Sequence, residues 1–218
     1  MILLALDTSG PDGSVALARD GVVCEGVEIH SSLDFAKSVL PVIDGLLTRH
    51  GLLLAEMDGF AAVTGPGSFT GLRVGLATIQ ALARCARKQA AGFTAIEVLA
   101  AAYREHADHL AVWIDVGRGE VYAADCNGLD LFAISAPRLD RPERLLSGLE
   151  AGTLIVGSGA RRNAELIERQ GSLRVDTSVR NLAAVVCDLA RAHPERFADP
   201  DRLDAVYVRA ATEKPKSV

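Results

Sequence analysis

The sequence has few of the patterns that mark metal or redox sites. Among its five histidines only His106 and His109 lie close together, and no third ligand is evident near them. No H-x-x-x-H string occurs. The cysteines are widely separated and form no C-x-x-C pair, so we expect reduced, buried thiols at Cys24, Cys85, Cys126 and Cys187. These absences argue against a zinc site and against a redox motif.

Long hydrophobic runs are also missing. No uninterrupted apolar stretch approaches the ~20 residues that a helix needs to cross a bilayer. The apolar run from Ile2 to Leu6 has no basic leader and is too short for the hydrophobic region of a signal peptide. We therefore expect a cytoplasmic protein without a membrane span.

An excess of positive charge is absent as well. The 23 Lys and Arg residues stand against 28 Asp and Glu, for a net charge of −5. Because affinity for nucleic acid comes mainly from phosphate neutralisation, we expect the chain to meet RNA only with the help of a partner. We interpret two basic clusters as solvated helix-end charges rather than phosphate contacts: Arg84, Arg87 and Lys88, and Arg161 and Arg162.

What the sequence does contain is typical of a compact α/β protein. Hydrophobic residues make up 49% of its 218 positions and charged residues 23%, the balance of a globular chain of one large or two small domains. The N-terminal half predicts an antiparallel meander, then two helices that flank a buried strand. The expected strands are 2–7, 14–19, 22–28 and 60–64, and the expected helices are 33–50 and 72–88.

The second half repeats the order of features in the first. A strand at 110–115 ends in Asp115, as the first strand ends in Asp7, and a return strand follows at 120–126. Asn127-Gly128 repeats the hairpin signal of Asp20-Gly21, and 154–159 echoes 63–67. We interpret this order as an internal duplication, the plan of the actin-like fold, with lobes at 1–106 and 107–218. Chance matches between common signals are the alternative.

The glycine-rich segment from Gly65 to Gly75 is the most informative stretch. Pro66 and Gly67 suit a type II turn with φ > 0 at Gly67, and Ser68 or Thr70 can cap the next helix. Such a loop can hold an anion through free backbone N–H groups and the helix dipole. However, no Gly-Lys pair occurs in the chain, so the loop is not a P-loop.

The helix after this loop is apolar nearly all round. Gly71 and Gly75 are costly in a helix, so we expect something to approach closely there. The helix is either buried on the protein's own sheet or pairs with another chain, and both interpretations remain open. Its apolar stripe consists of Leu72, Leu76, Ile79 and Ala83.

Hydrolytic chemistry has little support. No G-x-S-x-G elbow occurs. Asp7 and Asp115 end strands where carboxylates of an actin-like fold could hold a metal-bound water, but capping of a turn explains Asp115 equally well. Gly157-Ser158-Gly159-Ala160 is a weak candidate for an adenosine-binding glycine pair.

The string GPGSFTGLRVG, at 65–75, closely resembles the signature of the TsaB (YeaZ) family of bacterial tRNA threonylcarbamoyladenosine biosynthesis proteins. Further strings resemble family motifs along the whole chain. They are LALDTS at 4–9, His30-Ser31, LPVID at 40–44, Ile114-Asp115, RGEVY at 118–122, and VYVR at 206–209, which looks like a C-terminal strand. Departures at Val116-Gly117 and Thr94-Ala95 are small.

The resemblance implies an α/β, actin-like (ASKHA, ribonuclease H-like) duplicated fold with two lobes, each a mixed sheet opened by an antiparallel meander with flanking helices. It further implies a non-catalytic scaffold that binds its catalytic paralogue TsaD and supports recruitment of the ATPase TsaE. That complex forms N6-threonylcarbamoyladenosine at position 37 of tRNAs reading codons that begin with A. Such a scaffold needs no metal or cofactor, meets tRNA only within the complex, and could form a homodimer when alone.

Two sets of site residues follow from the resemblance and the helical pattern. Vestigial cofactor-binding positions are Asp7, Thr8, Ser9, Gly65 and Gly67. The expected partner-binding positions lie on the two N-terminal helices, as the four helices of a pseudo-symmetric bundle with TsaD. They are Leu33, Ala36, Leu40, Ile43, Leu47, Ser68, Phe69, Thr70, Gly71, Leu72, Gly75, Leu76 and Ile79.

Two other functions are weighed against the scaffold. A stand-alone actin-like ATPase or kinase would need an intact nucleotide site in the second lobe. A metalloprotease, an older label for relatives of this family, lacks its metal ligands in this sequence. Specific ATP turnover by the isolated protein would favour the first, and stoichiometric zinc or iron would favour the second.

Overall fold

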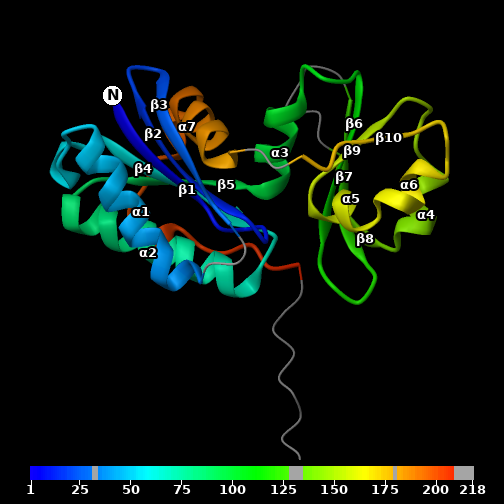
Figure 1. The fold of residues 1–218 in the computed structure, drawn as a ribbon, viewed down its shortest axis with the longest axis horizontal. Helices are drawn as coiled ribbons and strands as arrows, with labels where there is room; N and C mark the ends of the chain where they lie inside the picture. Colours follow the sequence, from blue (N-terminus) through cyan, green and yellow to red (C-terminus); the bar gives the residue numbers. More distant parts are fainter. Residues whose placement is uncertain (31–33, 128–134, 179–180, 209–218) are drawn as a thin grey trace, which may run out of the picture.

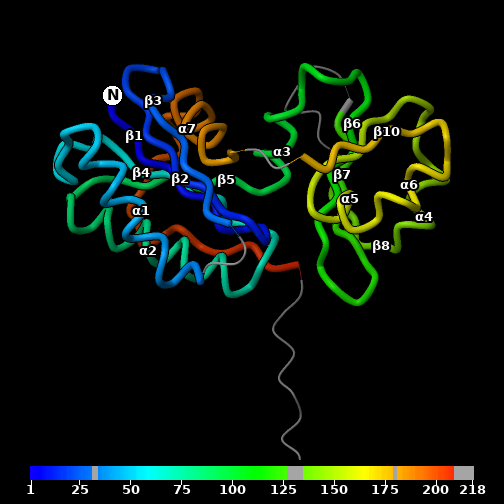
Figure 2. The backbone as a smooth tube through the Cα atoms, viewed as in Figure 1, coloured from blue at the N-terminus to red at the C-terminus, as the bar shows by residue number. Residues whose placement is uncertain are grey.

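Two mixed β-sheets, each with its own helices, form the two lobes of the molecule (Figure 1; Figure 2). The structure, a computed structural model, describes residues 1–30, 34–127, 135–178 and 181–208. The first sheet has the order β3-β2-β1-β4-β5 and the second β10-β9-β6-β7-β8. The first-sheet strands are β1 Ile2–Asp7, β2 Gly13–Arg19, β3 Val22–Ile29, β4 Gly59–Gly65 and β5 Ala90–Thr94.

The second lobe holds shorter elements. Its strands are β6 His109–Asp115, β7 Val121–Asn127, β8 Arg138–Asp140, β9 Leu154–Val156 and β10 Arg174–Val175. Its helices are α4 Pro142–Leu146, α5 Ser158–Arg162 and α6 Ala164–Glu168. The other helices are α1 Phe35–Arg49, α2 Phe69–Ala86, α3 Ala95–Tyr103 and α7 Leu182–Ala192, with 3-10 turns at Leu54–Glu56, Pro194–Arg196 and Pro200–Arg202.

The two sheets have the same topology, so the predicted duplication is confirmed. In the first, β1, β2 and β3 form an antiparallel meander, β4 runs parallel to β1, and β5 parallel to β4. In the second, β6, β7 and β8 form the meander, β9 runs parallel to β6, and β10 parallel to β9. Asp7 and Asp115 are the last residues of the two equivalent first strands.

The meander of the first lobe forms where the turn signals predict it. Asp20 and Gly21 both have positive φ, 52° and 85°, which is the backbone of a two-residue hairpin turn. The expected strand bounds agree with the observed ones to within one or two residues. Gly128, the second residue of the other predicted turn, lies outside the described residues.

Strand β1 is buried on both faces because helices cover both sides of its sheet. Leu4 and Leu6 face a core under α1 and α2, whereas Leu3 and Ala5 face a core under α7. Successive side chains of a strand point to opposite faces, so the continuous apolar run in β1 matches this two-sided cover.

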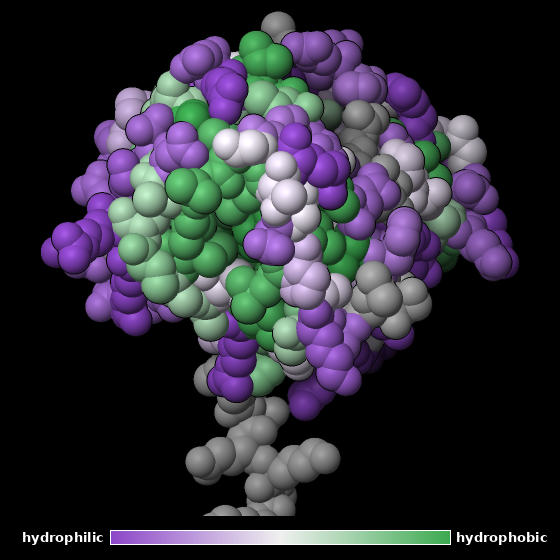
Figure 3. Space-filling view, turned by 60° about the vertical axis from the view of Figure 1, so that its left-hand side comes forward, coloured by the Kyte–Doolittle hydropathy of each residue, from purple (hydrophilic) through white to green (hydrophobic). Residues whose placement is uncertain are grey.

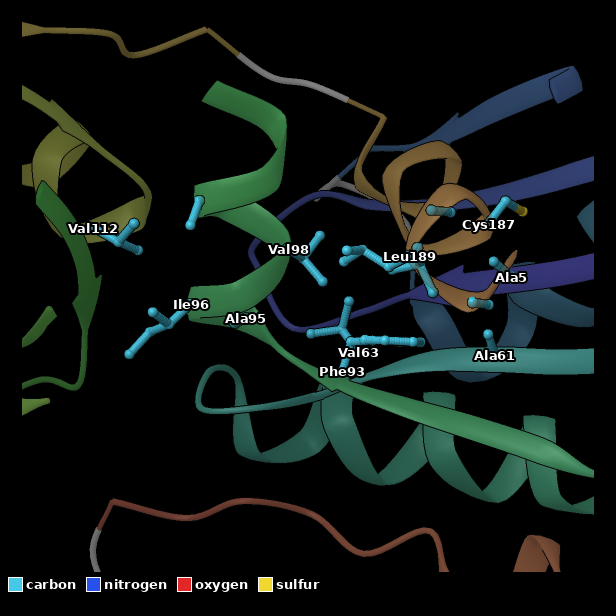
Figure 4. Close-up of a cluster of buried hydrophobic side chains, with 14 of the residues drawn as sticks. Ala5, Ala61, Val63, Phe93, Ala95, Ile96, Val98, Val112, Cys187 and Leu189 are labelled. Carbon is cyan, nitrogen blue, oxygen red and sulfur yellow. The ribbon is translucent and has the colours of Figure 1, made fainter. Parts of the chain in front are cut away.

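One hydrophobic core joins the lobes through α3. Figure 4 shows Ile96 on the side of α3 toward Val112 of the second sheet, and Val98 on the side toward Leu189 of α7. All four belong to one cluster of buried side chains. The lobes therefore share packing and are more than two sheets linked by a tether.

The chain after the second sheet returns to the first lobe. Helix α7 packs on β1 and β2, and Ala90 and Ala198 exchange two backbone hydrogen bonds of 3.0 Å. The division at 106 and 107 stays a prediction. The structure adds that α7, although it follows the second sheet in the sequence, covers the first.

The expected C-terminal strand is absent from the described residues. Val206 N donates to Thr64 O at 2.8 Å, but this single bond does not extend into a ladder, and 206–208 lie in no strand. Arg209, the last residue of that predicted strand, lies outside the described residues.

Only two of the four thiols match the expectation of burial. Cys126 and Cys187 are buried, and burial raises their pKa values to about 11 and about 12, which makes them poor nucleophiles. Cys24 and Cys85 are exposed, because they lie on the open side of β3 and the outer side of α2.

Within the described residues, no helix has the length and the apolar character that crossing a bilayer requires.

Candidate functional site

The ends of β1 and β6 meet at a small cavity between the lobes, which we call the Asp7 crevice. Its lining includes Asp7, Ser9 and Asp12 from the first lobe, and Ser158 and Arg161 from the second. In an actin-like fold these positions would face a nucleotide. The cavity volume is only about 80 Å³, whereas ligand pockets usually measure roughly 300 to 1,000 Å³.

One carboxylate oxygen of Asp7 is bonded to Ser9, two residues further along the chain. The Asp7 side chain is 3% exposed, and Oδ1 accepts hydrogen bonds from Ser9 N at 2.8 Å and Ser9 Oγ at 2.7 Å. Burial raises the pKa of Asp7, and the two bonds from Ser9 offset only part of that increase. The carboxyl therefore acts as the anchor of the turn after β1.

We expect Asp7→Asn to increase the free energy of unfolding at pH 7, by on the order of 1 kcal/mol, because the amide oxygen keeps both bonds without burying a charge. The pKa of Asp7 is higher in the folded state than in the unfolded state, where it is near 3.8. The parent protein therefore loses stability as the pH rises from about 3.8 through the pKa that Asp7 has in the folded state. The advantage of asparagine should thus be complete above the folded pKa and vanish below about 3.8. Urea titrations at pH 7 and pH 3.5 measure it.

Asp7→Ala is the control for this prediction, since it removes the acceptor and leaves both Ser9 donors without it. It should destabilise the chain at both pH values. Equal loss of stability in Asp7→Asn and Asp7→Ala would contradict our account of the crevice.

The glycine loop does not present its backbone as an anion cradle. Ser68 N donates to Ser9 O at 2.7 Å, and Ser68 Oγ, the N-cap of α2, accepts from Gly71 N at 3.2 Å. A Cβ on Gly67 would lie well under 3.0 Å from Ser9 O. The glycines thus allow the loop to pack against the chain's own turn.

The predicted turn type of this loop is wrong. Gly65 has the positive φ, 107°, and the Gly65–Pro66 peptide bond is cis, whereas Gly67 does not adopt a left-handed conformation. A Cβ on Gly65 would meet Leu72 and the carbonyl of Val206 at 2.8 Å each. Helix α2 begins at Phe69, after the N-cap Ser68 and three residues before the expected start.

Asp115, the equivalent of Asp7, is paired as well. Its Oδ1 accepts from Gly117 N at 3.0 Å, as in the predicted turn cap, and Oδ2 accepts from Arg162 at 2.6 Å. Arg161 contacts Asp12 of the other lobe at 3.3 Å. The two arginines thus bind carboxylates of their own chain. Arg84 of α2 likewise pairs with Asp201. All three side chains lie in the last turn of a helix and stay at least 40% exposed, so they are solvated helix-end charges as predicted, and the structure adds their carboxylate partners.

No group of three or more His, Cys, Asp or Glu side chains comes together in the described ranges as a metal site would require. His109 lies in β6 and contacts Glu150 at 3.3 Å. His106 packs its ring on Tyr103, with centroids 5.7 Å apart. The two histidines therefore do not share a helix face.

Helix α2 packs its apolar stripe on the protein's own sheet. Gly71 and Gly75 lie against Thr8, whose Oγ1 donates to Gly71 O at 2.8 Å. The approach that these glycines permit is therefore internal. Seven of the predicted partner-binding residues are buried in the folded chain: Ile43, Leu47, Gly71, Leu72, Gly75, Leu76 and Ile79.

The outer side of α1 and α2 remains uncovered, and it carries apolar side chains among charged ones such as Lys37, Asp44 and Arg73. Leu40 is 53% exposed and Phe69 43%. Figure 3 shows a broad hydrophobic area on the side of the molecule that carries these helices. We call this area the outer helix surface, and it includes exposed Ala36, Leu40, Pro41, Phe69, Ala77 and Ala81. Of the other predicted residues, Ser68 and Thr70 are exposed, and Leu33 lies outside the described residues.

The sequence did not reveal a cluster at one end of this surface. The Arg73 guanidinium lies 3.8 Å from the centroid of the Phe69 ring, and Tyr207 packs against the same ring at 5.3 Å. The spacing of four residues between Phe69 and Arg73 is a usable signal on a helix. Nothing in the sequence places Tyr207 there, since only the return of the chain to the first lobe does so.

Comparison with known proteins places these features in a family. The family model described as "TsaD: tRNA N6-adenosine threonylcarbamoyltransferase" matches residues 20–198. The chain is 35% identical over 127 residues to the tRNA threonylcarbamoyladenosine biosynthesis protein TsaB of Escherichia coli, covering 57% of this chain and 54% of that protein. The chain is 39% identical over 124 residues to the TsaB of Haemophilus influenzae, and the match covers 56% of this chain and 52% of that protein. The chain thus spans about half the length of these curated relatives.

The fold of a solved relative agrees over nearly the whole chain. The structure of YeaZ from Pseudomonas aeruginosa superposes with a TM-score of 0.80 at 27% identity, covering 95% of this chain and 99% of that one. The predicted duplicated, two-lobed actin-like fold is therefore confirmed.

Proposed function

Since the chain belongs to the TsaD family of tRNA N6-adenosine threonylcarbamoyltransferases and is similar to TsaB (YeaZ) proteins in sequence and fold, we propose that it is a non-catalytic scaffold subunit in tRNA threonylcarbamoyladenosine biosynthesis. In this role it binds and activates TsaD and supports recruitment of TsaE. The product is N6-threonylcarbamoyladenosine at position 37 of tRNAs reading codons that begin with A.

The state of the Asp7 crevice is the observation that supports a non-catalytic role. Asp7 and Asp115, which would hold a nucleotide-bound metal, already have partners within the chain. The loop donor that would meet a phosphate is bonded to Ser9 O. The space that remains is too small for a nucleotide.

The outer helix surface supports the partner role. An exposed apolar area on two adjacent helices is the kind of face that another pair of helices covers. The small side chains of Ala77 and Ala81 permit close approach of a second backbone, while Leu40 and Phe69 can insert between the partner's side chains. We propose that TsaD occupies this surface, and that a second copy of the chain can occupy it when TsaD is absent.

Reconstitution of tRNA modification tests the proposal. Omitting the chain from a mixture that contains TsaD, TsaE and the small-molecule substrates should reduce formation of threonylcarbamoyladenosine at least about tenfold. The double variant Asp7→Asn/Asp115→Asn should retain activity within about twofold. If either carboxylate worked in acid–base catalysis, roughly a hundredfold loss or more would follow. Specific ATP hydrolysis by the isolated chain would instead indicate the stand-alone ATPase.

A further inference from the structure

A second, larger cavity lies at the boundary of the lobes, and the proposed function does not use it. We call it the Tyr122 groove. One side is formed by the junction of β5 with α3 and by the end of α7, and the other by β7 and the residues before β8. Its volume is about 360 Å³, against about 80 Å³ for the Asp7 crevice. Unlike the Asp7 crevice, the Tyr122 groove falls within the range of ~300 to 1,000 Å³ that small ligands usually occupy.

The floor of the Tyr122 groove is apolar and belongs to the buried core. Phe93 is 1% exposed, Ile96 4% and Leu189 7%, and all three belong to the core that joins the lobes. Pro66 and Pro137 line the groove at its edges. A preformed apolar floor of this kind accepts a flat hydrocarbon body without a large cost in ordering side chains.

Among the described residues, the basic side chains of the lining have acidic partners: Arg196 pairs with Glu97, and His193 contacts Glu195 at 3.0 Å. Arg196 donates to Glu97 at 2.6 Å and its guanidinium lies 4.8 Å from the centre of the Phe93 ring. Burial by itself raises the pKa of Glu97, but hydrogen bonds from Arg196 and Thr94 outweigh it and hold the pKa below its usual value. The pair therefore offers no unmatched charge to a ligand, and a fully charged group placed here would lose its hydration without a counterion.

Two hydroxyls on the opposite wall have unused hydrogen-bonding capacity. Among the described residues, the Tyr122 hydroxyl makes no hydrogen bond, although Tyr122 lines the groove. Ser135 Oγ accepts from Asp125 N at 2.9 Å, which leaves its own proton for another acceptor. Both groups can donate to a carbonyl oxygen and accept from an N–H.

We propose that the Tyr122 groove binds a small, uncharged, amphipathic molecule: a flat aromatic or heteroaromatic body on the Phe93–Ile96–Leu189 floor, with a carboxamide-type group facing Tyr122 and Ser135. Such a ligand would contact both lobes at once. It would therefore stabilise their observed arrangement, since binding to the folded state alone raises thermal stability. The site is separate from the outer helix surface.

2-Naphthamide and 2-naphthoate form a suitable pair of probes, because they have the same body and differ in the charge of the head group. We expect the amide to bind the intact chain with a Kd below about 1 mM and to raise Tm, and the carboxylate to bind at least fivefold more weakly. Isothermal titration and thermal scans measure both. Absence of amide binding up to 10 mM, or tighter binding of the carboxylate, would overturn the proposal.

Two variants locate the binding. Tyr122→Phe removes one donor and should weaken amide binding about three- to tenfold, whereas Ala136→Trp places a large side chain at the exposed rim and should abolish it. Ala151→Trp is the matched control, at an exposed alanine outside the groove, and should bind as the parent does. Unchanged binding in both groove variants would refute the site. All three can be assayed without TsaD or tRNA, so failure here leaves the scaffold proposal untouched.

Discussion

Replacing Leu40 with glutamate is expected to weaken association with TsaD by about 100-fold or more, with little effect on the fold. Leu40 is 53% exposed on α1, so the free chain loses almost no buried apolar contact. In the proposed complex the same position would be covered by another helix pair. There the substitution would replace an apolar anchor by an uncompensated buried charge, a change of roughly 3 kcal/mol.

Leu139→Glu is the matched control for Leu40→Glu. Leu139 is also an exposed leucine, 38% exposed, but it lies on β8 of the second lobe. We expect it to leave the affinity for TsaD within about twofold of the parent, measured by titration of purified chains, with circular dichroism to verify folding. Full affinity in Leu40→Glu, or equal losses in both variants, would show that TsaD does not use the outer helix surface.

Gly75→Ala is expected to destabilise the chain itself, by about 2 kcal/mol or more, although alanine is normally the better helix former by about 1 kcal/mol. The new Cβ would lie well under 3.0 Å from Thr8 Oγ1 but 3.4 Å from Thr8 Cβ. The conflict is thus with one side-chain atom. We therefore expect Thr8→Ala to restore most of the loss in the double variant, even though it removes the bond from Thr8 to Gly71 O.

Gly71→Ala separates this explanation from a general intolerance of α2. Its Cβ would meet the backbone carbonyl of Thr8 rather than the side chain, so Thr8→Ala should not rescue it. Urea unfolding measures the stability of the parent, of Gly75→Ala and Gly71→Ala, and of each of these two variants combined with Thr8→Ala. A stable Gly75→Ala protein that no longer binds TsaD would reverse our conclusion, since the glycine would then serve the contact between chains that the sequence suggested.

Helix α2 shows what the spacing of apolar residues can predict and what it cannot. The stripe of Leu72, Leu76 and Ile79 predicts a helix with a face that must be covered, and each of these side chains is indeed buried. Periodicity cannot say what covers it, because a sheet of the same chain and a helix of another chain bury the same kind of residue. The packing of Thr8 against Gly71 and Gly75 shows that the protein's own sheet covers this face.

The glycine loop shows a similar limit. Ser68 as the N-cap follows from local chemistry, since its side chain satisfies a backbone donor at the next turn. The turn type does not follow, because Gly65, with a φ of 107°, is packed so closely against the carbonyl of Val206 that a Cβ would lie 2.8 Å from it, and Val206 lies 141 positions further along the chain. The Tyr122 groove has no local signal at all, since its walls come from both lobes.

By itself the sequence determined the meander of the first lobe, the helices α1 and α2 that flank β4, the first two strands of the second lobe, the carboxylates at the ends of β1 and β6, and the family. These depend on side-chain period, turn residues and short motifs, which act over a few positions. The tertiary structure alone decided that Thr8 fills the space at Gly75, that Arg162 pairs with Asp115, and that α7 covers the first sheet. Those contacts join residues far apart in the chain, and no local preference specifies which distant surface a buried face will meet.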